Sequence, residues 1–220
     1  MLLNIITKLG VSPKRLGHNW KRQSTNSLNT QYMDLSHVNL RESELRNWSA
    51  QCSDLTHAQL HGSYISNSQF NSAYMDESVL YASTLEHVDL SKAELEMACL
   101  ANAVTMNCNF RGADLMHANM QNVRMLDTCF DNANLDHATY ENARLHIGTM
   151  RGARLGYTDM RGALLQHYDL SGAELVGVRL DGAVWDNVDV TGAHFRNVDF
   201  TRMKRGMVNL HDAVLDNCIY

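Results

Sequence analysis

Residues 113–135 read ADLMHANMQNVRMLDTCFDNANL, and a hydrophobic side chain occupies every fifth position of this stretch. These central positions hold Leu115, Met120, Met125, Phe130 and Leu135. The residue two positions before each of them is Ala, Val or Thr. Neither a helix nor a simple strand repeats its inward side chains with a period of five. The period indicates a chain that directs two residues of each five inward and then turns a corner.

The same period runs from Leu35 to Tyr220 without a phase break. Of the 38 central positions only Thr105 and Arg205 are not hydrophobic, whereas a composition of 45% hydrophobic residues predicts about 17 hydrophobic ones. Two positions earlier, 34 of the 38 residues are Ala, Ser, Gly, Cys, Thr or Val, and the exceptions are Met33, Trp48, Tyr168 and Met203. An internal repeat of this extent decides the fold class.

Units such as ADL at 113–115, ANL at 133–135 and AEL at 173–175 resemble the pentapeptide-repeat family, and the resemblance covers residues 31–220. It implies an all-β fold, a right-handed quadrilateral β-helix in which four repeats make one coil. The chain supports this coil, because alanine occurs at every twentieth position from Ala73 to Ala213. The column that begins at Trp48 contains no alanine. We predict about nine coils, which at roughly 4.8 Å per coil make a rod on the order of 45 Å long.

Two large residues at small positions fit this packing. Trp48 precedes the central residue Ala50, so the two positions exchange sizes and conserve volume. Tyr168 follows Gly148 by one coil, and the glycine leaves room for its ring.

The two ends of the repeat differ. Residues 1–30 carry five bases and no acid, and we interpret them as a basic N-terminal cap or tail, either a short helix or disordered. Residues 31–220 form the solenoid. Its C-terminal end has no capping segment, and an apolar end with unpaired backbone tends to associate. We therefore predict a homodimer through the C-terminal coils, as the family resemblance also implies, with an interface formed by Leu210, Leu215, Ile219 and Tyr220.

Several classes of chemistry find no support in the residues. There is no CxxC, phosphate loop or Ser/His/Asp arrangement, so we expect neither an enzyme nor a cofactor. The five cysteines lack zinc spacing and are odd in number, which favours a reducing, cytoplasmic location. No stretch approaches the roughly 20 apolar residues of a membrane helix. His37 with His57, and His117 with His137, are expected to stack about 5 Å apart as solvated ladders and not as a metal site.

Charge is concentrated on one of the four predicted walls. This acidic wall consists of residues 33–37 and the corresponding residues at every twentieth position through 213–217, and it holds ten acids against Arg154 and Arg196. Its first six coils contain no Lys or Arg, and their eight acids are spaced at about one per 3.6 Å, close to the roughly 3.4 Å between charges on a DNA strand. We predict that these acids bind a partner: Asp34, Asp54, Asp76, Glu77, Glu94, Glu96, Asp114 and Asp136.

The resemblance suggests a partner, because some pentapeptide-repeat proteins mimic B-form DNA and bind type II topoisomerases. DNA gyrase or topoisomerase IV is therefore the candidate partner of a non-enzymatic, protein-binding solenoid. One alternative is a secreted bacterial effector or host adaptor with an N-terminal secretion signal in residues 1–30. Another is a cytosolic interaction scaffold with an unknown partner, in which acids beside the central residue only follow the family's repeat and aid solubility. Direct nucleic-acid binding is not expected, because residues 31–220 carry 24 acids against 14 bases.

Overall fold

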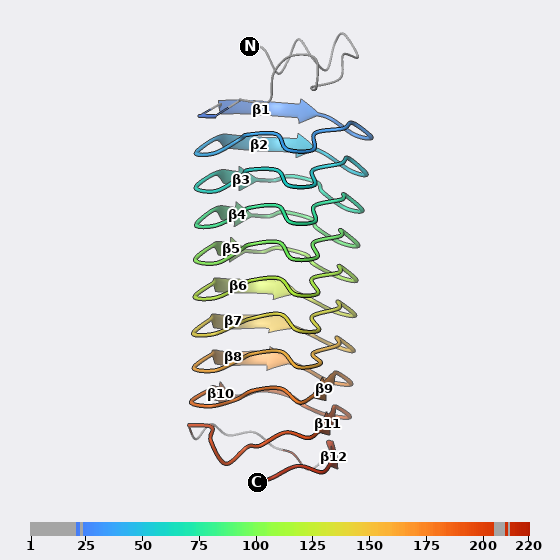
Figure 1. Ribbon diagram of the computed structural model, residues 1–220, viewed down its shortest axis with the longest axis vertical. Coiled ribbons are helices and arrows are strands. Elements are labelled where there is room, and N and C mark those ends of the chain that lie inside the picture. Colours follow the sequence, from blue (N-terminus) through green and yellow to red (C-terminus); the bar gives the residue numbers. More distant parts are fainter. Residues whose placement is uncertain (1–20, 23, 205–209, 211) are drawn as a thin grey trace.

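The computed structural model describes residues 21–22, 24–204, 210 and 212–220. Every regular element within these residues is a β-strand, and the strands stack into a rod of parallel coils (Figure 1). Each strand pairs in parallel with the strand one coil away, so that Thr25 pairs with Leu45 and Leu45 with Ile65. The coil therefore contains twenty residues, or four repeats. This confirms the right-handed quadrilateral β-helix of about nine turns.

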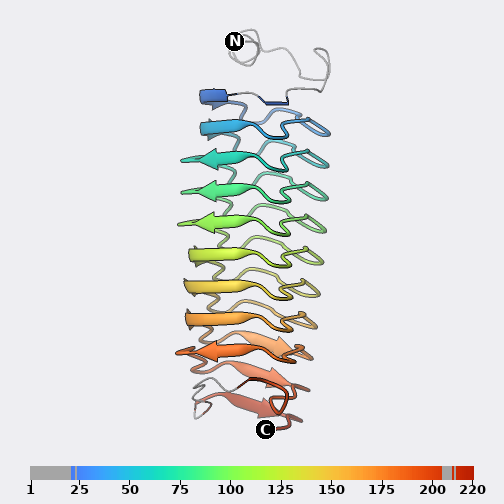
Figure 2. The same ribbon diagram turned by 90° about the vertical axis from the view of Figure 1, so that its left-hand side faces the viewer.

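Two sheets lie on opposite walls of the rod. The nine-stranded sheet has the order β1-β2-β3-β4-β5-β6-β7-β8-β10, and the three-stranded sheet has the order β12-β11-β9. Figure 2 shows the strands of the two sheets running in opposite directions on the two sides. The larger sheet contains β1 (Ser24–Asn29), β2 (Glu44–Ser49), β3 (Tyr64–Ser66), β4 (Thr84–Glu86), β5 (Val104–Met106), β6 (Arg124–Cys129), β7 (Arg144–Thr149), β8 (Leu164–Asp169) and β10 (Val184–Asp186). The smaller contains β9 (Glu174–Val176), β11 (His194–Arg196) and β12 (Val214–Asp216).

The two sheets identify the walls. The smaller sheet forms the C-terminal part of the acidic wall, whose earlier coils are joined by isolated parallel bridges such as that between Glu94 and Asp114. We call the opposite side the sheet wall, defined as residues 43–47 and the corresponding residues at every twentieth position through 183–187. It is the third of the four repeats in each coil, counted from the acidic wall, and so faces away from it.

The corners are made by residues in the left-handed region of φ. This residue lies two positions after the central one, as His117 (φ 59°) does after Leu115. At many corners the next backbone N–H donates to the central carbonyl, and Ala118 N lies 3.0 Å from Leu115 O. A positive φ at the third of four residues defines a type II turn. Asn, His and Gly recur at this position because they tolerate this conformation better than most residues.

The core contains the central and small side chains, as predicted. Trp48 and Ala50 are both buried, and the indole packs edge-on against Phe70 at a centroid distance of 4.9 Å. The Trp48 Nε1 donates to Thr30 Oγ1 at 2.8 Å, which satisfies its polar atom. The buried central residue Thr105 shares a hydrogen bond of 3.1 Å with the hydroxyl of Thr128. The other polar central residue, Arg205, lies outside the described residues.

The first coil begins before the predicted boundary at residue 31. β1 starts at Ser24 and pairs with β2, and Leu28 and Thr30 are buried. The hydrophobic period misses this coil because Thr25 and Thr30 occupy its central positions, while backbone pairing continues through them. Of the predicted N-terminal cap or tail, either a short helix or disordered over residues 1–30, residues 1–20 and 23 lie outside the described residues. No helix in the described part of the chain has the length and apolar character needed to cross a membrane.

Candidate functional site

The eight predicted acids lie on one wall. Parallel bridges connect Asp34 to Asp54, Asp54 to Tyr74, Tyr74 to Glu94, and Glu94 to Asp114, so these residues occupy the same position in successive coils. The remaining four acids follow the central residue by one or two positions on the same wall: Asp76, Glu77, Glu96 and Asp136. The fold therefore brings together acids that are up to 102 residues apart in the sequence, from Asp34 to Asp136.

Three of these aspartates also hold the backbone of the turns. The Oδ1 atoms of Asp34, Asp54 and Asp114 accept the N–H two residues later, at 3.1, 3.0 and 3.1 Å. Short side chains with an acceptor oxygen favour this local bond, which explains why the position before the centre so often holds Asp or Asn. The occurrence of Asn in place of Asp at the same position, as at Asn134, is the sequence signal for this role in the turn.

Two further aspartates connect neighbouring coils. Asp76 Oδ1 accepts the Glu96 N–H at 2.9 Å, and Asp136 Oδ1 accepts the Gly156 N–H at 2.7 Å. Asp136 also forms an ion pair with Arg154 at 2.6 Å. The charge of Asp136 is therefore compensated, and this carboxylate contributes less to the field of the wall than the acids in earlier coils.

The middle of the acidic wall contains a shallow depression lined by four carboxylates from neighbouring coils. It is lined by Asp76, Glu94, Glu96 and Asp114 together with Lys92, Ala93 and Gly112. The Glu94 side chain is exposed and that of Glu96 is half-buried. Glu77 lies beside His57, with 3.4 Å between Oε2 and Nδ1. Like charges concentrated in a concave region attract cationic groups at long range.

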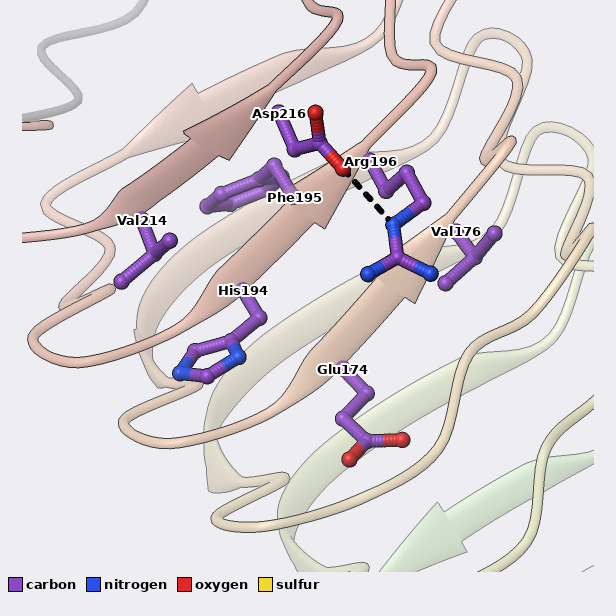
Figure 3. A pocket seen from close by; sticks show the side chains of 7 residues that line it. All are labelled: Glu174, Val176, His194, Phe195, Arg196, Val214 and Asp216. Carbon is purple, nitrogen blue, oxygen red and sulfur yellow. Dashed lines mark hydrogen bonds and ion pairs between the residues drawn. The ribbon is translucent and has the colours of Figure 1, made fainter.

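The C-terminal part of the wall has a different character. A pocket over β9, β11 and β12 is lined by Glu174, Val176, His194, Phe195, Arg196, Val214 and Asp216 (Figure 3). Arg196 Nε donates to Asp216 Oδ2 at 3.0 Å within it. Opposite charges here compensate one another, so the uncompensated acidic surface lies farther toward the N-terminus.

The histidine stacks form as predicted at the corner beside the acidic wall. The rings of His37 and His57 lie 4.7 Å apart and those of His117 and His137 4.9 Å apart, with interplanar angles of 15° and 18°. Tyr157 extends the second stack, with its ring centroid 5.3 Å from that of His137. Within residues 21–22, 24–204, 210 and 212–220, no three His, Cys, Asp or Glu side chains are grouped as metal ligands.

The predicted dimer residues lie at the C-terminal end of the rod (Figure 1). Leu210 and Leu215 are half-buried and pack against the core. The side chains of Ile219 and Tyr220 are 60% and 81% exposed. The end of the solenoid thus presents apolar groups to its surroundings.

Comparison with known proteins gives the same repeat. The family model for pentapeptide repeats matches in 8 copies, over residues 53–91, 107–136, 128–166, 149–184 and 169–202. No curated protein sequence matches the chain. Among solved structures, the chain is similar to HetL of the cyanobacterium Nostoc sp. strain PCC 7120, a pentapeptide repeat protein involved in regulating heterocyst differentiation. The identity is 21%, the TM-score is 0.57, and the match covers 94% of this chain and 91% of HetL.

A second similar structure is a trypsin-treated form of QnrB1, a plasmid-mediated fluoroquinolone resistance protein. The identity is 17%, the TM-score is 0.55, and the match covers 90% of each chain. At these identities, both likenesses concern the fold.

Proposed function

Because the chain belongs to the pentapeptide-repeat family, we propose that it is a non-enzymatic, protein-binding solenoid whose acidic wall contacts a basic protein surface. One observation carries this proposal. Between Asp54 and Asp114, none of the carboxylates on the acidic wall forms an ion pair with a Lys or Arg among the described residues. Elsewhere such pairs are common, as between Asp131 and Arg151 at 2.7 Å.

Uncompensated carboxylates in successive coils favour association with cations. Their mutual repulsion is relieved when a basic surface approaches, and the field of the wall speeds the encounter. Salt screens such a field, with a Debye length of about 10 Å at 0.1 M ionic strength. Binding through the acidic wall is therefore expected to weaken as the salt concentration rises.

A type II topoisomerase is the partner we propose to test first. The DNA-binding groove of such an enzyme accepts a rod with regularly spaced negative charges, and the coils repeat their acids at about the spacing of phosphates on one DNA strand. The fold shared with QnrB1, a fluoroquinolone resistance protein, is compatible with this partner.

Supercoiling by purified DNA gyrase, and decatenation by topoisomerase IV, provide the test. We expect the protein to inhibit the enzyme, or protect it from a quinolone, at low salt. The variant Glu94→Lys/Glu96→Lys is expected to lose at least about tenfold in potency, because like charges then face the partner. These residues are preferable to Asp54 and Asp114, whose carboxylates also hold turns.

The matched control is Asp127→Lys/Asp186→Lys, which makes the same change of charge on the sheet wall. It is expected to retain its effect on the topoisomerase. Equal losses in both variants would show that the acidic wall is not the contact. Absence of inhibition, protection and binding with the wild-type protein at low salt would remove the topoisomerase as partner.

A further inference from the structure

Two arginines on the sheet wall lack the compensation found elsewhere. Arg124 in β6 and Arg144 in β7 are direct register partners, one coil apart, and both are exposed. Within the described part of the chain, neither forms an ion pair with a carboxylate, and the exposed Asp127 on the same wall pairs with neither. Like charges directly opposite each other destabilise paired strands. The pair therefore opposes folding and requires an explanation outside the fold.

Exposed apolar side chains adjoin the two arginines. Leu126 and Ile147 are 40% and 46% exposed. Ile147 has a φ of 53°. Among the described residues with positive φ, it is the only β-branched one. That conformation is unfavourable for a branched side chain, and an exposed one gains little from packing in return. The strain and the exposure together mark this side of the wall as a contact surface.

The acidic wall of a second copy is complementary to this surface. We propose that the sheet wall of one copy docks on the acidic wall of another, with Arg124 and Arg144 facing the depression around Glu94 and Glu96. Both walls belong to the same solenoid and repeat at the same rise per coil. Charges on adjacent coils of one copy therefore match charges on adjacent coils of the other without a change of spacing.

Apolar groups are available on the acidic side as well. Tyr74 and Met97 flank the depression in the chain and are 47% and 54% exposed. Leu126 and Ile147 of the other copy can pack against these two side chains. A contact that combines central apolar groups with complementary charges is what protein interfaces use for both affinity and orientation.

The contact joins different surfaces on the two copies, because the two walls lie on opposite sides of the rod (Figure 2). Such a heterologous contact leaves one free wall of each kind and extends into rows. It also covers the acidic wall, so a basic partner competes with it. The docking needs only this protein and does not rest on the partner proposed above.

Sedimentation velocity of the full chain measures the association. At about 0.01 M ionic strength the Debye length is about 30 Å, and at about 1 M it is about 3 Å. We expect the sedimentation coefficient of the wild-type protein to rise with concentration at the low ionic strength and not at the high one. A dimer through the C-terminal ends does not confuse this readout, because the test is the change with salt.

Two complementary variants decide which walls meet. Arg124→Glu/Arg144→Glu removes the basic pair, and Glu94→Lys/Glu96→Lys removes the acidic one. Each alone is expected to lose the salt-sensitive association, while an equimolar mixture recovers it, since each variant retains the wall that the other lacks. Arg111→Glu, on a neighbouring wall and likewise without an ion pair to a carboxylate of the described residues, serves as control and should associate as the wild type does.

Ile147→Asn separates contact from stability. Asn tolerates the positive φ better, so this variant should unfold at a higher temperature and yet associate less. A wild-type protein whose sedimentation does not depend on salt would overturn the proposal, as would a mixture that fails to associate. Binding of poly-glutamate to the wild-type protein, without self-association, would assign the arginines to an acidic partner and also overturn it. A negative topoisomerase assay would leave these outcomes unchanged.

Discussion

Gly148 and Tyr168 form a matched pair inside the rod. A Cβ on Gly148 would lie 2.5 Å from Tyr168 Oη and 2.4 Å from the carbonyl oxygen of Thr128. Non-bonded carbon and oxygen atoms do not approach so closely, so the tyrosine ring fits only because the residue one coil earlier has no side chain. Tyr168 is fully buried, and its burial raises the pKa of its hydroxyl far above the ordinary value of 10.0.

The variant Gly148→Ala is therefore expected to lower the free energy of unfolding by about 1–3 kcal/mol, the usual cost of overpacking a core. Urea denaturation measures the change. In the background Tyr168→Leu, Gly148→Ala should lower the free energy of unfolding by less, because the clash with the ring is gone. A smaller loss should remain, because the clash with the Thr128 carbonyl is still present. Equal costs in both backgrounds would show that the two residues are not coupled.

At the scale of the coil, ion pairs between neighbouring turns add to the backbone ladder. The buried carboxylate of Asp131 accepts the N–H of Arg151 at 3.1 Å and pairs with its guanidinium at 2.7 Å. Burial acts to raise the pKa of Asp131, but the hydrogen bonds and the charge of Arg151 outweigh it and hold the pKa below the ordinary value of 3.8. The ionised form is thus favoured by folding.

This lowered pKa fixes the direction of a pH effect. The stabilisation is fully present above the unfolded-state pKa near 3.8 and is lost as the pH falls through the folded-state value. We expect Asp131→Asn to lower the free energy of unfolding at pH 7 by about 1–2 kcal/mol and to make unfolding less sensitive to acid. Thermal unfolding between pH 7 and pH 3 (about the range in which carboxylates titrate) measures this. The exposed Asp127→Asn serves as control and should respond to acid as the wild type does. If the wild type and Asp131→Asn lost stability equally as the pH falls, the prediction would be wrong.

The architecture of the coil follows from sequence more completely than its details do. Inward positions are set by hydrophobicity, so Leu115, Trp48 and the alanine column could be placed by counting. The left-handed corners could not, because residues as different as His117 and Ile147 occupy them, and backbone closure imposes their φ. Likewise, the pairing of an acid depends on side-chain geometry one coil away, so the ion pair of Asp136 with Arg154 cannot be predicted by counting.

At the scale of the whole molecule, the last coil presents exposed apolar side chains, and we propose it as the axial dimer interface. The exposed Ile219 and Tyr220 follow the partly buried Leu215 in the last described coil. Apolar groups and strand edges at the end of a solenoid favour association with another such end.

The variant Ile219→Lys/Tyr220→Lys is expected to convert a dimer into a monomer. Sedimentation at high ionic strength is the suitable measurement, since it suppresses contacts between charged walls. Tyr81→Lys replaces an exposed tyrosine away from the end and should leave the dimer intact. A wild-type protein that remains monomeric at every concentration would disprove this interface.

The step of twenty residues, divided into four repeats, acts like a reading frame for the surface. Removing five consecutive residues would preserve the inward pattern but turn everything beyond the cut by a quarter of a revolution. The acids after the cut would then continue on a neighbouring side, and the negative stripe would break in two. Removing twenty would shorten the rod and keep the stripe straight. Length changes that spare the surface are therefore restricted to whole coils, although the interior alone would tolerate much smaller ones.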